Sequence, residues 1–236
     1  MGCSKMKRLV QPEWLDTLPP DDPRAVRSRR DLRRVNAWMG SRRLLAQALI
    51  KDGPGDPPRH LTELGAGDGT FLLGLAQILA PRWPGLEVTL LDLHENVSSR
   101  TLDAFADLGW RAKVVVADVF DWPDRAGDQA GEVVMANLFL HHFENARLAA
   151  LLQQVSLRAG YFVALEPRRA AWPLFCSRWL GAIGCNAVTR HDAVVSVRAG
   201  FSGHEISGLW PDPSGWELAE RPAGSFSHLF SARKTK

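Results

Sequence analysis

The chain has 236 residues, of which 45% are hydrophobic and 23% are charged, and its formal net charge is +3 at pH 7. A chain of this size and composition can bury its own core, which excludes a disordered protein and a small scaffold that depends on disulfides. No apolar run approaches the roughly 18 residues of a membrane span, so we expect a cytoplasmic protein. The cysteines are too irregularly spaced for a disulfide framework or a zinc site, and we expect free thiols at Cys3, Cys176 and Cys185.

The first 51 residues predict a helical cap. Apolar residues recur at helical spacing from about 22 to 39, so the arginines of RAVRSRRDLRR fit the solvated face of a helix better than a nucleic-acid-binding surface. A second helix is expected over 42–51, with Ser41 as its N-cap. The cap is expected to precede a core domain that spans residues 52–236.

From about residue 60 onward, short β-rich runs alternate with helical patterns, which is typical of a Rossmann-like α/β fold with helices on both faces of the sheet. Crossover helices are expected in TFLLGLAQILA, NVSSRTLDAFADLG and ARLAALLQQVSLRAG, and a further helix at about 191–200. Near the C-terminus, GHEISGLW and WELAERPAGSFSHLFSAR are expected to pair, which completes a seven-stranded mixed sheet with an antiparallel last strand. The other strands are expected at 60–64, 86–91, 112–117, 132–137 and 161–166.

An insertion at about 170–188, AAWPLFCSRWLGAIGCNAV, follows the fifth expected strand and is apolar nearly all round. Its largest side chains are those of Trp172, Phe175 and Trp179. A soluble helix of this kind needs a covering, so we expect it to pack beneath the N-terminal helices and to complete the cap.

The sequence ELGAGDG after the first expected strand predicts a ligand-binding loop. Its glycines do not fit the dinucleotide-binding pattern, because Thr70 stands where the third glycine of that pattern belongs. A polyphosphate binds to backbone N–H groups away from carboxylates, whereas Glu63 and Asp68 flank this loop. The loop therefore favours a ligand that carries positive charge.

Two more acidic residues follow the next two strands. Asp92 ends the second strand, where its carboxylate can accept hydrogen bonds from both hydroxyls of a ribose. Asp118 follows the third strand, where it can accept an adenine amino proton while the Val119 N–H reaches a ring nitrogen. One strand-end aspartate is commonly a turn or a helix cap. Two of them in this order after the glycine loop favour a nucleoside site.

With these motifs in this order, residues 60–233 resemble the class I S-adenosylmethionine-dependent methyltransferases, and ELGAGDG matches the first motif of that family. The resemblance implies S-adenosylmethionine as the cofactor, which agrees with the charge argument because its sulfonium and ammonium groups are cationic. It also implies that Asn137, at the end of the fourth strand, lies beneath the sulfonium. The implied cofactor-binding residues are Glu63, Gly65 and Gly67 around the methionine part, Asp92 at the ribose, Asp118 and Val119 at the adenine, and Ala66 and Leu93 beside them.

The segment NLFLHHFENARLAALL follows the fourth strand and faces the site, because ligands bind outside the carboxyl ends of the strands in open α/β sheets. It is similar to small-molecule methyltransferases of the ubiquinone/menaquinone-biosynthesis type and to the H-D-W segment of plant phenol O-methyltransferases. The second resemblance implies that His141 removes a phenolic proton, which an imidazole can do at neutral pH. The alternatives are that His142 is the base, or that both histidines are structural.

ALEPRR at the end of the fifth strand places Glu166 and Arg168 at the same edge of the sheet. Glu166 can orient a histidine or bind a substrate hydroxyl, and Arg168 can bind a substrate carboxylate, but we favour an ion pair between the two. LEPRR and EWLDTLPPDDPRAVRSRRDLRRVNAWMG together are similar to methyltransferases found beside type III polyketide synthases in bacteria.

The sequence therefore predicts a methyltransferase that acts on a small molecule, at a phenolic or polyketide-derived hydroxyl, as a monomer or homodimer and without a metal. The alternatives are carbon methylation of a quinol precursor, methylation of RNA or protein, and a cofactor-binding module without activity. The apolar cap argues against a nucleic-acid partner, because an RNA site would need a basic groove with exposed stacking aromatics.

Overall fold

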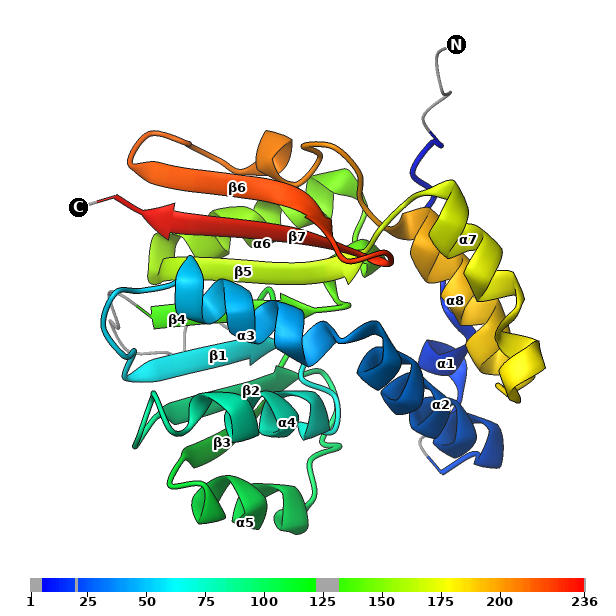
Figure 1. The fold of residues 1–236 in the computed structure, drawn as a ribbon, viewed down its shortest axis with the longest axis horizontal. Helices are drawn as coiled ribbons and strands as arrows, with labels where there is room; N and C mark the ends of the chain where they lie inside the picture. The colour runs from blue at the N-terminus through cyan, green and yellow to red at the C-terminus, as the bar shows by residue number, and fades with distance from the viewer. Residues whose placement is uncertain (1–5, 20, 122–131, 236) are drawn as a thin grey trace.

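A computed structural model describes residues 6–19, 21–121 and 132–235. Its strands are β1 (His60–Leu64), β2 (Glu87–Asp92), β3 (Arg111–Val116), β4 (Glu132–Asn137), β5 (Ala159–Pro167), β6 (Trp216–Ala223) and β7 (Ser227–Lys234). They form one sheet in the order β3-β2-β1-β4-β5-β7-β6, in which β7 runs antiparallel to both neighbours (Figure 1). The predicted seven-stranded mixed sheet with an antiparallel last strand is confirmed.

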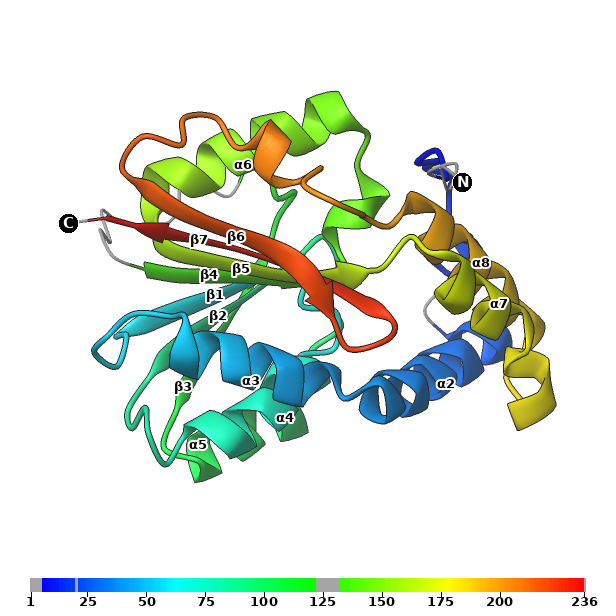
Figure 2. The same cartoon turned by 45° about the horizontal axis from the view of Figure 1, so that its top comes forward.

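Helices cover both faces of this sheet, as Figure 2 shows. One face carries α3 (Ser41–Lys51), α4 (Thr70–Leu79) and α5 (Ser99–Asp107), and the other carries α6 (Asn145–Arg158). Eight of the nine residues of β5 are buried, as expected for a central strand that both layers cover. Its apolar side chains therefore join two cores, one on each face of the sheet.

A separate group of helices lies at the carboxyl ends of the parallel strands (Figures 1 and 2). It consists of α1 (Trp14–Thr17), α2 (Pro23–Met39), α7 (Ala171–Arg178) and α8 (Ala187–Ala199), with α8 in contact with the other three. The predicted insertion packs mainly on α8 and contacts α2 only near its C-terminal end. Trp172 and Trp179 keep 58% and 61% of their surface exposed. The expected covering of this insertion is therefore wrong within the described residues.

Helix α3 belongs to the sheet layer. Leu45 and Leu49 are fully buried in the core beneath α4, and the Tyr161 hydroxyl of β5 donates to the Ala48 carbonyl at 3.4 Å. The division of the chain into a cap and a core domain at residue 51 stays a prediction.

Ser41 is not the N-cap of α3. Gly40, with φ 70°, both ends α2 and caps α3. Ser41 therefore lies in the first turn, and its buried hydroxyl has no hydrogen-bond partner among the described residues. Glycine adopts this left-handed conformation at little cost, so the chain turns from one helix into the next without a polar cap.

The C-terminal pairing differs from the expectation. The segment GHEISGLW contains the short helix η4 (Ser207–Leu209), and both antiparallel strands come from WELAERPAGSFSHLFSAR. The buried Glu220 carboxylate accepts the N–H groups of Ile206 (3.1 Å) and Ser207 (2.8 Å), which holds that segment in a turn. Pro222 is tolerated in β6 because this strand lies at the edge of the sheet.

None of the helices in the described residues combines the length and the apolar character of a transmembrane segment. Cys176 and Cys185 are free thiols, as predicted. Cys3 lies outside the described residues.

Candidate active site

The loop between β1 and α4 turns through three glycines in the left-handed conformation. A Cβ on Gly65 would lie 2.2 Å from a ring carbon of Phe139, so only glycine fits there. A Cβ on Gly67, where φ is 57°, would meet no atom within 4 Å. Gly67 instead lines a cavity of about 860 Å³. Its backbone is therefore open to a ligand that approaches closely.

The strand-end aspartates also line this cavity. Asp92 accepts the N–H of Gly67 at 2.8 Å through Oδ2 and that of His94 at 3.0 Å through Oδ1. Asp118 accepts the N–H of Phe120 at 3.0 Å through Oδ1. A carboxylate has about four acceptor sites, so both groups keep capacity for a ligand. Of the predicted cofactor-binding residues, those in the cavity lining are Gly65, Gly67, Asp92, Leu93, Asp118 and Val119.

The other three predicted residues lie outside this lining. Ala66 is buried and donates its N–H to the Leu91 carbonyl at 3.0 Å, which fixes the loop to the end of β2. Glu63 and Asn137 lie at the ends of two neighbouring strands. Each has a buried side-chain oxygen, Oε2 and Oδ1 respectively, without a hydrogen-bond partner among the described residues.

The two unpaired oxygens indicate which charge a ligand at these strand ends should carry. Burial, together with the carboxylates of Asp68 and Asp92, raises the pKa of Glu63 well above its usual value. An unpaired buried acceptor is costly, and a nearby cationic donor would relieve the cost at Glu63 and favour its charged form. An anionic phosphate would instead repel the charged form of Glu63 and offer no donor to its unpaired oxygen. The corner therefore fits a cationic group.

The loop after β4 is shaped by one carboxylate. Glu166, at the end of β5, is fully buried and accepts the N–H groups of Phe139 (3.0 Å), Leu140 (2.9 Å) and His141 (3.3 Å). Leu138 adopts a left-handed conformation with φ 53°, which is rare for a residue with a side chain and is held here by this anchoring. The expected ion pair between Glu166 and Arg168 is absent from the structure, because the Glu166 carboxylate is engaged by this loop.

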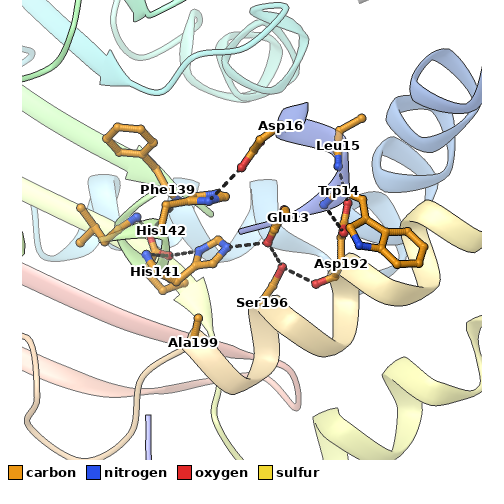
Figure 3. Close-up of polar contacts among 12 residues, drawn as sticks. Glu13, Trp14, Leu15, Asp16, Phe139, His141, His142, Asp192, Ser196 and Ala199 are labelled. Carbon is orange, nitrogen blue, oxygen red and sulfur yellow. Dashed lines mark hydrogen bonds and ion pairs between the residues drawn. The ribbon is translucent and has the colours of Figure 1, made fainter. Parts of the chain in front are cut away.

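His141 lies between two carboxylates, of which Figure 3 labels that of Glu13. Its Nδ1 lies 2.8 Å from Glu166 Oε2, and its Nε2 lies 3.3 Å from Glu13 Oε1. Burial lowers the pKa of His141, but the hydrogen bonds and charges of Glu13 and Glu166 outweigh burial and raise that pKa to about 9. At pH 7 both ring nitrogens therefore carry protons. An imidazolium with both N–H groups donated has no lone pair for a substrate proton.

His142 has a different environment. Its side chain is 29% exposed, and its Nδ1 lies 3.6 Å from Asp16 Oδ2 (Figure 3). Burial and the positive charge of His141 lower the pKa of His142 to about 4, so its imidazole is neutral at pH 7. Partial burial and the carboxylates of Glu13 and Asp192 raise the pKa of Asp16 to about 6, so this group is mostly ionised at pH 7. The two adjacent histidines thus differ in protonation state.

A second cavity of about 270 Å³ lies between the cap helices and the loop after β4. Leu15, Asp16, Leu138 and His142 line both cavities, so the two meet at these residues. The rest of the smaller cavity is mainly apolar, with side chains that include Leu32, Val35, Met39, Pro173, Leu180 and Phe226. An apolar cavity with a few polar groups at one end is typical of a small-molecule site.

The N-terminal segment supplies Glu13 and Asp16, which the sequence analysis missed. The N–H groups of Trp14 and Leu15 donate to the Asp192 carboxylate at 2.8 and 3.0 Å (Figure 3). The Trp14 ring stacks on His191 with centroids 3.8 Å apart. These contacts fix the segment to α8 and direct its acids to the histidines. The signal available in the sequence was EWLD, two acids three residues apart in a segment assigned to the cap.

The same cluster contains residue types that can bind a metal ion. Glu13, His141 and His142 each offer one ligand atom, and these atoms lie within 4.8 Å of one another. A metal-binding histidine must present an unprotonated nitrogen, whereas both nitrogens of His141 face carboxylates. The hydrogen-bonded network therefore accounts for the cluster, and the absence of a metal stays a prediction.

Residues 62–158 match the family model described as a methyltransferase domain. No curated protein matches the sequence. Among solved structures, the plantazolicin methyltransferase BpumL in complex with SAH has 14% identity and a TM-score of 0.63, with 92% of each chain covered. This likeness shows the fold.

Two O-methyltransferases are also similar in structure. An O-methyltransferase family protein from Burkholderia thailandensis has 21% identity and a TM-score of 0.60, with 91% of this chain and 61% of that chain covered. The mitomycin 7-O-methyltransferase MmcR has 20% identity and a TM-score of 0.59, with 94% and 60% covered. The chain therefore spans about three fifths of the length of these two proteins. Residues 62–158 are thus similar to a methyltransferase domain, and the chain shares the fold of a methyltransferase solved in complex with SAH.

Proposed function

We propose that the protein transfers a methyl group from S-adenosylmethionine to a hydroxyl group of a small, apolar aromatic molecule held in the smaller cavity. The observation that carries the proposal is the position of His142. Its neutral imidazole lines both cavities and lies beside an ionised Asp16, so it stands where a substrate and a cofactor would meet.

The larger cavity and the strand ends next to it offer groups that suit this cofactor. Glu63 and Asn137 offer buried oxygens to a cationic group, and Asp92 offers a carboxylate to ribose hydroxyls. Asp118 and Val119 line the same cavity, where a carboxylate and a backbone N–H can hydrogen-bond to an adenine. S-adenosylmethionine, when bound, supplies an electrophilic methyl group. The residues of the chain then have to orient the acceptor and remove its proton.

His142 is the group that can remove this proton. It is neutral at pH 7, whereas a pKa of about 9 leaves on the order of 1% of His141 neutral. When His142 accepts a proton, the Asp16 carboxylate stabilises the imidazolium that forms. We therefore propose His142 as the base in place of His141. His142 was the alternative base in the sequence analysis. His141 is a positioning residue that joins Glu166 to the N-terminal segment.

The smaller cavity indicates the kind of acceptor. Its volume of about 270 Å³ and its mainly apolar lining favour one or two fused or linked rings over a nucleotide or a peptide. Neither a basic groove nor a cluster of arginines is part of this lining, which disfavours an RNA acceptor.

The direct test is incubation with S-adenosylmethionine that carries a labelled methyl group and a panel of phenols, quinols and tRNA. We expect label on a phenolic oxygen, identified by mass spectrometry and by release on ether cleavage. Label on a ring carbon or on tRNA, with none on oxygen, would replace the proposed acceptor.

The glycine loop yields a prediction on cofactor binding. Gly67→Val should weaken binding of S-adenosylmethionine by at least about tenfold, or 1.4 kcal/mol, because the new side chain would project into the larger cavity. Gly85→Val is the matched control, since Gly85 has φ 70° and the same open surroundings in the turn before β2. Both variants share the backbone strain, so calorimetry that finds equal affinities for them would contradict the assigned loop.

A second prediction concerns the base. His142→Ala should lower kcat by about 10²–10⁴-fold near pH 7. The defect should shrink as the pH approaches 10, because a phenol with a pKa of about 10 then ionises in solvent. His204→Ala, on an exposed side chain elsewhere in the chain, is the matched control. A His142→Ala enzyme within about threefold of wild type at pH 7 would contradict the base role.

The dependence of kcat/KM on pH below 7 tests whether Asp16 positions His142 and stabilises its imidazolium. In wild type, kcat/KM should rise as Asp16, with a pKa of about 6, loses its proton. Asp16→Asn should remove that rise and lower the plateau, because no carboxylate remains to stabilise the His142 imidazolium. If the rise of kcat/KM with pH is unchanged in Asp16→Asn, the rise reports the titration of another group.

The His141 network yields a prediction on stability. The folded-state pKa of His141 is raised from 6.5 to about 9, so its stabilisation is complete below pH 6.5 and is lost as the pH rises through 9. The contribution is on the order of 3 kcal/mol, or roughly 6–12 °C in Tm. Glu13, with a pKa of about 2, does not titrate in this range. The Tm difference between wild type and His141→Gln should therefore narrow above pH 9, and a constant difference would contradict the imidazolium assignment.

A further inference from the structure

The outer face of α7 and of the short helix η3 (Leu180–Ile183) carries an exposed apolar stripe. Its members are spaced as one face of a helix. The Phe175 ring stacks on that of Trp172 with centroids 5.9 Å apart, and it is tilted against that of Trp179 at 6.0 Å. About 150–250 Å² belongs to each aromatic side chain, so the three rings alone expose on the order of 300–400 Å². The stripe and its exposed fractions are Trp172 (58%), Phe175 (52%), Trp179 (61%) and Ile183 (58%).

The fold itself does not need this stripe. The inner face of α7 accounts for the packing of the helix, because Pro173 and Ser177 are buried and line the smaller cavity. Typical monomers have a largest apolar patch of about 300–600 Å², which is often functional. A continuous row of three neighbouring aromatic rings on an outer helix face therefore points to a binding surface.

Cationic side chains surround the η3 end of the stripe. Arg178 precedes Trp179 on α7, Arg190 of α8 lies against Gly181, and Arg27 of α2 donates to the Gly184 carbonyl at 3.2 Å. All three residues are exposed. Within the described parts of the chain, none of these guanidinium groups has a carboxylate within ion-pair distance. The surface thus combines exposed aromatic rings with unpaired positive charge.

We infer that this stripe docks on the surface of an anionic lipid bilayer. Tryptophan is favoured at the headgroup level of membranes, where its ring is apolar and its N–H is polar. A helix that lies in that interface has aromatic and aliphatic side chains on one face and arginine or lysine beside them. Arginines near an anionic surface each add attraction that salt screens. The stripe and its three arginines have this arrangement.

This arrangement favours a lipid surface over two other occupants. A single-stranded nucleic acid needs rings spaced for bases along a basic groove. These rings instead contact one another on an outer helix face, and the stripe continues to the aliphatic Ile183. A second copy of the chain would bring its own Arg27, Arg178 and Arg190 to the contact in a symmetric dimer, where like charges repel.

The test is sedimentation of the full chain with vesicles made of equal parts phosphatidylcholine and phosphatidylglycerol, and with phosphatidylcholine alone. We expect binding to the anionic vesicles that weakens as salt is added. The triple variant Trp172→Ala, Phe175→Ala, Trp179→Ala should bind at least about tenfold less. The double variant Arg178→Gln, Arg190→Gln should bind roughly 25-fold less.

Matched controls separate the stripe from general surface effects. Leu157→Ala removes an apolar side chain that is 70% exposed on α6, and Arg82→Gln removes an exposed charge after α4. Both should bind the vesicles as wild type does, and all variants should keep the wild-type circular dichroism spectrum. A variant that loses this spectrum is replaced by Phe175→Ser alone, which should still bind less tightly than wild type.

Three results would overturn the inference. These are a wild-type chain that stays in the supernatant with anionic vesicles, a triple variant that binds as wild type does, and a stripe-dependent dimer or oligouridine complex without vesicle binding. The measurement needs neither cofactor nor acceptor, so its failure leaves the proposed methylation standing, and failure of the methylation leaves the docking result standing.

Discussion

The hydrogen bonds made by the Glu166 carboxylate hold the two halves of the site together. This one buried group accepts three N–H groups of the loop after β4 and binds His141, which in turn binds Glu13 of the N-terminal segment. Glu13 also accepts a hydrogen bond from Ser196 of α8. The sheet and the cap are thus joined by a chain of alternating charges. Removal of one member would leave another buried and uncompensated, which typically costs about 3–5 kcal/mol.

The same chain of charges separates the roles of two adjacent histidines. The centroids of the His141 and His142 rings lie 4.3 Å apart, yet one ring faces two carboxylates and the other faces the cavities. The charge on His141 disfavours a second charge beside it, so the pKa of His142 falls as that of His141 rises. Neighbouring groups whose pKa values are moved apart in this way mark the acid and base positions of many enzymes.

The sequence pattern predicted those parts of the molecule whose conformation depends on residues close together in the chain. The five parallel strands and the glycine loop follow from short runs of sequence, and Gly67 and Asp92 meet at the expected edge of the sheet. The errors lie where distant residues decide. GHEISGLW turns because Glu220 binds its N–H groups, and the state of His141 depends on Glu13, which is 128 residues away in the sequence. No periodicity in either segment carries that information.

The N-terminal segment is attached mainly by polar contacts to distant residues, and hydrophobic periodicity in the sequence does not predict such contacts. Between residues 6 and 19, the only buried side chain is that of Glu13. The segment is held mainly by polar contacts, among them those of Arg8 to the carbonyls of Phe143 (2.9 Å) and Ala199 (2.8 Å). A segment with so little buried apolar surface opens at a lower free energy than the core does. Since Glu13 is bound to a charged His141, the free energy of that opening depends on the protonation of the same histidine. The Glu166 carboxylate, which fixes the loop after β4, therefore also affects the free energy needed to detach the N-terminal segment, whose Leu15 and Asp16 line both cavities.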